Sequence, residues 1–94
     1  QQERDMALSE QAMISKINKA LPEANAVPMA EFYGDPSRKG IWLRGSEEFA
    51  SDGLPIFNAG TIEDALHPTL QAIVDDNGWY GEPYDGGTLM LYEV

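Results

Sequence analysis

His67 is the only histidine in the chain, and histidine is the side chain that most often transfers protons near neutral pH. A hydrolytic triad would place it beside a serine or threonine nucleophile and a carboxylate. None of the five serines stands in a G-x-S-x-G or S-x-x-K pattern. Because His67 directly precedes Pro68, a good first residue of a helix, it fits a helix N-cap or a plain surface position better than a catalytic one. We therefore expect no catalytic residue at His67.

Three pairs of adjacent acids have the residue types of acid–base chemistry: Glu47/Glu48, Glu63/Asp64 and Asp75/Asp76. Glycoside hydrolysis uses two carboxyl groups about 5 to 9 Å apart across a sugar-binding cleft. Neighbouring positions in a sequence do not establish that geometry, and a chain with many acids holds close pairs by chance. The sequence favours a protein that is not an enzyme. A small carboxylate-based enzyme or ligand-binding domain is an alternative.

The stretch 75–78, with the sequence DDNG, has the residue types of a calcium-binding loop. An EF-hand loop needs oxygen ligands at positions 1, 3, 5 and 12 and a glycine at position 6. With Gly78 at position 6, Ile73 takes position 1 and Tyr84 takes position 12, so the motif fails. We expect no metal site. A weak cation site is the alternative, formed by Asp75, Asp76, Glu82 and Asp85.

Phosphate-binding motifs rich in glycine are absent from the sequence. Neither G-x-x-x-x-G-K-[ST] nor G-x-G-x-x-G occurs, and the turn sequence at 85–87, DGG, lacks the following helix and lysine that a phosphate site needs. The chain has no cysteine, which excludes disulfides, thiolate zinc sites and cysteine nucleophiles. We therefore expect no cofactor.

Acidic residues are concentrated in the second half of the chain. The 94 residues carry 16 acids and 6 bases, a net charge of −10, and every Lys and Arg lies within residues 1–44. This balance argues against binding nucleic acid or an anionic membrane, because phosphate contacts need clustered Lys and Arg. The charge either keeps the domain in solution or docks it on a basic protein partner. The candidate partner-binding acids are Glu47, Glu48, Asp52, Glu63, Asp64, Asp75, Asp76, Glu82 and Asp85.

Aromatic residues near the C-terminal end are a second candidate for partner binding: Trp79, Tyr80, Tyr84 and Tyr92. They either fill the core or act as exposed interface hot spots, where Trp and Tyr are enriched. Aromatics between basic residues would suit stacking on single-stranded nucleic acid, but here the neighbours are Glu82 and Asp85. We add Trp79 and Tyr84 to the candidate partner-binding residues.

The elements that position these side chains begin with a helix. A chain of this length is one domain over 1–94, and we expect residues 1–8 to be frayed. Ser9 is a good N-cap, and an apolar stripe at helical spacing follows it until Pro22 ends the helix. Residues 27–33 and 40–44 then predict two strands of a hairpin. The loop 46–53 is expected to bury Phe49 as an anchor, and 54–57 to add a short irregular strand.

The second half predicts a helix followed by a hairpin. Residues 61–66 are expected to form a short turn, after which Pro68 begins a helix that ends at Asn77-Gly78. Strands at 79–84 and 88–94 flank the turn at 85–87, with the last strand central and the Pro83 strand nearer an edge. The predicted fold class is α+β, a two-layer sandwich of two helices on an antiparallel sheet of four to five strands. The expected order is α-β-β-(β)-α-β-β.

The absence of a catalytic motif and the acidic second half favour a non-catalytic protein-binding module that docks a basic partner. One alternative is that the acids imitate phosphates and block a nucleic-acid-binding protein, as small acidic inhibitors from phages and mobile elements do. Another is self-assembly through an edge strand at 54–58 or 79–84, so that monomer and homodimer are both open. With no targeting signal and no apolar run near the roughly 20 residues that span a bilayer, we expect a cytoplasmic location.

Overall fold

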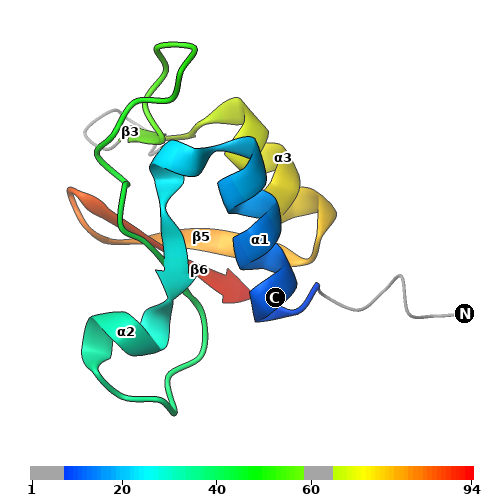
Figure 1. Ribbon diagram of the computed structural model, residues 1–94, viewed down its shortest axis with the longest axis vertical. Helices are drawn as coiled ribbons and strands as arrows, with labels where there is room; N and C mark the ends of the chain where they lie inside the picture. Colours follow the sequence, from blue (N-terminus) through cyan, green and yellow to red (C-terminus); the bar gives the residue numbers. More distant parts are fainter. Residues whose placement is uncertain (1–7, 59–64) are drawn as a thin grey trace, which may run out of the picture.

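A four-stranded antiparallel sheet organises the protein (Figure 1), with its strands in the order β1-β2-β6-β5. The structure is a computed structural model and describes residues 8–58 and 65–94. The sheet strands are β1 (Ala26–Pro28), β2 (Ile41–Leu43), β5 (Trp79–Asp85) and β6 (Thr88–Glu93). The short strands β3 (Phe57–Asn58) and β4 (Ala65–Leu66) pair with each other in a separate ribbon.

Two longer helices, α1 (Glu10–Ala20) and α3 (Pro68–Asp76), pack together and against the sheet strands (Figure 1). A short 3₁₀ turn, η2 (Pro22–Ala24), follows α1, and a five-residue helix, α2 (Met29–Tyr33), lies between β1 and β2. The predicted two-layer α+β sandwich is confirmed. No helix in the described ranges is both long enough and apolar enough to cross a membrane.

The helix α1 forms where capping and apolar spacing predict it. The Ser9 hydroxyl accepts a hydrogen bond from the Ala12 N–H at 3.2 Å, which satisfies a free donor of the first turn. Met13 and Ile17 are completely buried, four residues apart on one face of the helix. The helix ends at Ala20, just before the Leu21-Pro22 step, because the residue before a proline is disfavoured in the helical conformation.

The main core lies between this helical layer and one face of the sheet. Side chains alternate along a strand, so Ile41 and Leu43 of β2 and Leu89 and Leu91 of β6 point to the same face. All four are completely buried in one apolar cluster with residues of α1 and α3. The intervening residue Trp42 points to the opposite face, which we call the outer face.

The prediction of a strand over the whole of 27–33 is wrong beyond Pro28. The chain turns into α2 there, because Pro28 takes the N-cap position and Met29, Ala30 and Glu31 are good helix formers. Gly34, at φ +67°, ends the helix in the left-handed conformation that glycine tolerates. The antiparallel pairing of β1 with β2 that the hairpin prediction requires is present.

The C-terminal hairpin follows its prediction closely. Gly86 and Gly87 connect β5 to β6, and the Asp85 carboxylate accepts a hydrogen bond from the Gly87 N–H at 2.9 Å. Strand β6 lies between β2 and β5, so it is central, and β5 lies at an edge of the sheet. An edge position suits Pro83, which has no N–H to donate to a neighbouring strand.

Three local predictions need correction. Phe49 is 62% exposed and is not a buried anchor. Residues 65–66 form strand β4 instead of a turn, and the remainder of that predicted turn, 61–64, lies outside the described residues. Leu8 is not frayed, because its N–H donates to the Asn77 carbonyl at 3.0 Å. Residues 1–7 of the expected frayed segment lie outside the described residues.

Candidate functional site

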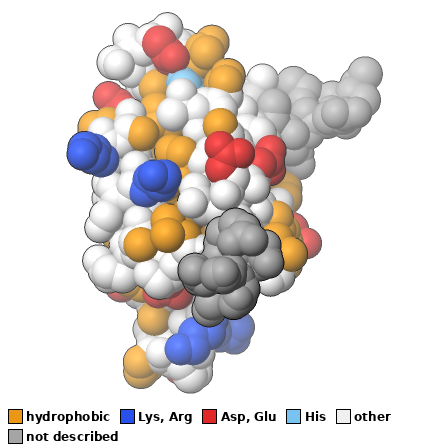
Figure 2. Space-filling model, turned by 90° about the vertical axis from the view of Figure 1, so that its right-hand side faces the viewer, with side chains coloured by type: hydrophobic (Ala, Val, Ile, Leu, Met, Phe, Trp, Pro, Cys, Tyr) orange, Lys and Arg blue, Asp and Glu red, His pale blue; other side chains and the backbone are white. Residues whose placement is uncertain are grey.

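The described candidate acids come from separate parts of the fold. Glu47 and Glu48 follow β2, Asp52 lies in the next loop, and Asp75 and Asp76 end α3. Glu82 and Asp85 lie on β5, whereas Glu63 and Asp64 lie outside the described residues. Figure 2 shows acidic side chains at separate places on one face, among hydrophobic and basic ones. The acids therefore do not gather into a single row on this face.

One of these acids, Glu47, reaches the tip of the C-terminal hairpin. The Glu47 carboxylate occupies the space where a side chain on Gly87 would stand, beside the turn that Asp85 begins. The alternative cation site of Asp75, Asp76, Glu82 and Asp85 is not brought together. Within 8–58 and 65–94, no group of three or more His, Cys, Asp or Glu residues is placed to hold a metal ion.

Trp79 is not available to a partner. Its side chain is 3% exposed, and its indole N–H donates to the Leu8 carbonyl at 2.7 Å. Trp79 therefore belongs to the core, and its hydrogen bond connects β5 to the residues just before α1. Its prediction as a partner-binding residue is wrong.

His67 has a structural role at the start of α3. The sequence predicts either an N-cap or a surface position for His67, and the structure shows it as the N-cap of α3. Its side chain is buried. Its Nδ1 accepts a hydrogen bond from the Thr69 N–H at 3.1 Å, so that nitrogen carries no proton. Its Nε2 then donates to the Asp52 carboxylate at 2.9 Å. Both ring nitrogens are thus occupied by the fold, and neither is free for catalysis.

Asp52 provides a pH-dependent contribution to stability. The hydrogen bond from the Leu54 N–H lowers the pKa of Asp52 below its ordinary 3.8, against the effect of partial desolvation, and the His67 hydrogen bond lowers it further. A lowered folded-state pKa stabilises the fold at neutral pH, and this contribution is lost as the pH falls through the folded-state pKa. Asp52→Asn should therefore lower the urea midpoint at pH 7, and its difference from the wild type should shrink below about pH 4.

The control for this experiment is Asp76→Asn, which removes an exposed acid without hydrogen bonds to the described residues. It should change the urea midpoint less at pH 7. An Asp52→Asn difference of equal size at both pH values would show that the ionised carboxylate is not what stabilises the loop.

The outer face of the sheet is covered by aromatic side chains instead of the polar ones usual on a solvated face. We define this aromatic face by its members: Phe32, Tyr33, Trp42, Tyr80, Tyr84 and Tyr92. Phe32, from α2, packs edge to face against Trp42 at 4.8 Å and against Tyr84 at 5.0 Å between ring centroids. It thereby joins β2 to β5 across the intervening strand β6, whose Met90 is completely buried on this side of the sheet.

The aromatic face is open to solvent along β5. Tyr80 is 43% exposed and Tyr84 is 53% exposed, and Glu82 stands between them on the same side of the strand. Glu82 lies opposite Met90, which lies opposite Trp42, in one row across the sheet. Exposed tyrosines beside a carboxylate on an aromatic base form a surface that can bind a cationic group.

Two arginines of the chain already lie on rings of this face. The Arg38 guanidinium is 4.2 Å from the centre of the Tyr33 ring, and that of Arg44 is 5.6 Å from the Trp42 ring. Arg38 also approaches the Asp35 carboxylate at 3.9 Å. Glu82 has no such partner, since none of the described basic groups lies within salt-bridge distance of it.

The Tyr92 phenol interacts electrostatically with several charged and phenolic groups of this face. Burial raises the pKa of the Tyr92 phenol above its usual 10.0, and Tyr33, Glu82 and Tyr80 raise it further, while Arg38 lowers it. The rings of Tyr80 and Tyr92, directly opposite on neighbouring strands, are 5.7 Å apart. Tyr92 is therefore protonated at neutral pH and presents a neutral phenol next to the Glu82 charge.

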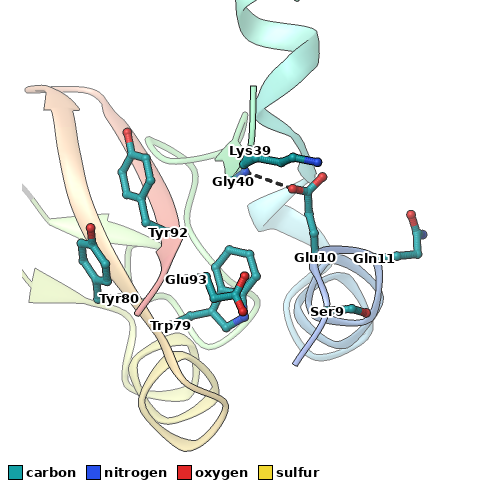
Figure 3. Close-up of a pocket in the computed structure, with 9 residues that line it drawn as sticks. All are labelled: Ser9, Glu10, Gln11, Lys39, Gly40, Trp79, Tyr80, Tyr92 and Glu93. Carbon is teal, nitrogen blue, oxygen red and sulfur yellow. Dashed lines mark hydrogen bonds between the residues drawn. The ribbon is translucent and has the colours of Figure 1, made fainter. Parts of the chain in front are cut away.

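A groove of about 900 Å³ lies at one end of the aromatic face (Figure 3). It runs between the first residues of α1 and the ends of β5 and β6, and Tyr80 and Tyr92 stand side by side on one wall. On the other wall, the Glu10 carboxylate accepts a hydrogen bond from the Gly40 N–H at 3.0 Å. Lys39 and Glu93 also line the groove, so it carries charges of both signs.

The candidate site includes residues that the sequence did not single out. Phe32, Tyr33 and Trp42 were assigned only to the first hairpin, yet they support the tyrosines of the second. The sequence Ile-Trp-Leu of β2 could have located Trp42. If Ile41 and Leu43 point into the core, alternation along the strand puts Trp42 on the other face of the sheet. No comparable signal locates Phe32, which reaches the face through α2.

Comparison with protein-family models, with curated proteins and with solved structures finds no match to this chain. The geometry of the aromatic face and the charges around it are therefore the basis for assigning a function.

Proposed function

We propose that the protein is a non-catalytic binding module that docks a basic protein partner on its aromatic face. The observation that carries this proposal is the exposure of Tyr80 and Tyr84 on either side of Glu82. Tyrosine combines a large apolar surface with a hydrogen-bonding hydroxyl, and for this reason it is enriched among the residues that dominate binding energies. Protein interfaces are enriched in aromatic residues and are surrounded by a polar, solvent-accessible rim.

The acids outside the face support the same proposal at longer range. Glu47 approaches Gly87 at the hairpin tip beyond Tyr84, and the 16 acids against 6 bases give the protein its net charge of −10. The negative electrostatic field of the protein increases its association rate with a basic protein. Added salt screens this field and lowers the association rate. We include a cytoplasmic location in the proposal as the expected setting of this encounter.

Two alternatives have less support. Phosphate imitation calls for acids in regular rows, whereas the described candidate acids lie on separate elements: the residues after β2, the end of α3 and strand β5. Self-assembly through β5 is opposed by Glu82, Pro83 and Asp85 and by the irregular pairing near the end of the strand, which are features that protect edge strands. The net charge also opposes contact between two copies.

The proposal predicts that Tyr80→Ala/Tyr84→Ala abolishes partner capture. Protein from the source cells is passed over the immobilised wild type and variant at low and high salt, and the bound proteins are identified by mass spectrometry. The double variant should weaken binding of a captured basic protein by more than roughly 30-fold, since a single hot-spot side chain is already worth about 2 kcal/mol.

The matched control is Phe49→Ala/Leu54→Ala, which removes two other exposed hydrophobic side chains from the loop after β2. It should leave capture unchanged, and urea denaturation should show that both double variants are folded. If the control abolishes capture and the tyrosine variant does not, the binding surface is the 49–54 loop. If the wild type captures no basic protein at either salt concentration, the proposed function is wrong.

A further inference from the structure

We propose that the aromatic face recognises an arginine side chain of its partner, whose guanidinium pairs with Glu82 and is flanked by the rings of Tyr80 and Tyr84. This inference rests on the proposed function and adds to it the identity of the central contact. It assigns a role to three residues on consecutive outward positions of one strand.

The first support is that the chain places its own arginines on this face. Arg38 lies over Tyr33 and Arg44 lies over Trp42, at 4.2 and 5.6 Å from the ring centres. The exposed rings of Tyr80 and Tyr84 have the same chemistry and no cation of the described chain above them. A further guanidinium from outside would therefore complete a pattern that the protein already uses twice.

The second support is the position of Glu82. Strand geometry puts it about 7 Å from the backbone of each tyrosine, close enough for one guanidinium to reach the carboxylate and the edge of a ring. In the same row across the sheet Glu82 lies next to Met90, with Trp42 beyond it, so apolar side chains flank the carboxylate on the side of the neighbouring strand.

Arg38 does not neutralise this site. Its guanidinium approaches Asp35 and stacks on Tyr33, and Asp35 is held in place by hydrogen bonds from the Ser37 N–H and hydroxyl at 3.0 and 2.8 Å. The local turn thus keeps the Arg38 guanidinium beside Asp35 and Tyr33, outside salt-bridge distance of Glu82. The Glu82 carboxylate remains the acceptor that a partner can use.

The arrangement favours arginine over lysine. A guanidinium is planar, pairs with a carboxylate through two parallel hydrogen bonds and stacks on aromatic rings, whereas an ammonium group is a strongly hydrated point charge. Both features that distinguish arginine are matched here, by the Glu82 carboxylate and by the tyrosine rings on either side of it.

The test is an NMR titration of the ¹⁵N-labelled protein with three synthetic peptides. They are acetyl-Gly-Arg-Gly-Arg-Gly-amide and its analogues in which lysine or citrulline replaces arginine. The arginine peptide should shift the amide signals of residues 80–84 and bind at least about fivefold more tightly than the lysine peptide, because two charge-assisted hydrogen bonds replace one. The citrulline peptide, which has no charge, should not bind.

Glu82→Gln is the critical variant, and Asp76→Asn is its control because it removes the same charge from the end of α3. Glu82→Gln should weaken the arginine peptide at least about fivefold, whereas Asp76→Asn should change its affinity less than twofold. Equal binding of the arginine and lysine peptides, equal effects of the two substitutions, or shifts centred on α3 would each overturn the inference.

The two proposals fail in different ways. If Tyr80→Ala/Tyr84→Ala abolishes capture of the basic protein while Glu82→Gln captures it as well as Asp76→Asn does, the proposed function stands and the arginine contact is wrong. If neither the tyrosine variant nor Glu82→Gln reduces capture, both are wrong.

Discussion

Replacing Gly45 with alanine should lower the free energy of unfolding by about 3 kcal/mol, close to the upper end of what overpacking costs. Gly45 is the second residue after β2, and its N–H donates to the Ala24 carbonyl at 2.9 Å. An alanine Cβ there would overlap the Glu23 carbonyl oxygen, a backbone atom of η2 that no side-chain rotation can move away. The two segments would have to separate, breaking the contact that joins η2 to the end of β2.

Urea denaturation followed by circular dichroism measures this effect, and the melting temperature should fall by roughly 12–24 °C for a domain of this size. Gly86→Ala is the control, because a Cβ at Gly86 meets no atom within 4 Å and its backbone angle is ordinary. It should change stability by less than about 0.5 kcal/mol. Equal effects of the two substitutions would mean that η2 does not approach Gly45 so closely.

Trp79→Ala should destabilise the fold by about 3–5 kcal/mol, the usual range for deleting a buried aromatic ring. The ring is 3% exposed in the main core, and its loss also removes the hydrogen bond to the Leu8 carbonyl. Because whole domains have only about 5–15 kcal/mol of stability, the variant will be largely unfolded if the total is at the low end. The measurement is again urea denaturation, with Trp42 as the remaining fluorescent tryptophan.

Two further variants keep this prediction testable if Trp79→Ala does not fold. Trp79→Phe retains most of the ring volume and loses the hydrogen bond, so it should cost about 1 kcal/mol from that bond in addition to a smaller packing loss. Tyr84→Ala, at a side chain that is 53% exposed, should cost less than Trp79→Phe and Trp79→Ala. A Trp79→Ala variant as stable as Tyr84→Ala would place Trp79 on the surface and restore it as a partner-binding residue.

The elements that could be predicted are those with local signals at both ends. Ser9 and Pro22 bound α1, Pro68 and Gly78 bound α3, and the glycine turn fixes the last hairpin. The helix α2 was missed because its aromatic end, Phe32-Tyr33, favours a strand, while Met29, Ala30 and Glu31 before it favour a helix. Phe32 also packs on Trp42 and Tyr84, and such contacts between distant segments leave no local signal.

The candidate site was predictable in composition but not in arrangement. Alternation along β5 places Tyr80, Glu82 and Tyr84 on one side and Trp79 on the other, which the sequence alone already implies. It does not say which side faces the helices. That depends on the pairing of β5 with β6, since Gly81 and Pro83 leave few side chains on the inner side of β5 to indicate the core.

The packing of Phe32 between Trp42 and Tyr84 has a consequence for how this protein can change during evolution. The rings that join β2 to β5 also support the tyrosines proposed to bind the partner, so selection for stability and selection for binding would act on the same side chains. In most domains a binding surface can drift while the core is kept, because different residues serve the two purposes. Here a substitution that adapts the aromatic face to a new partner also changes the packing of the sheet, and compensating changes must accompany it.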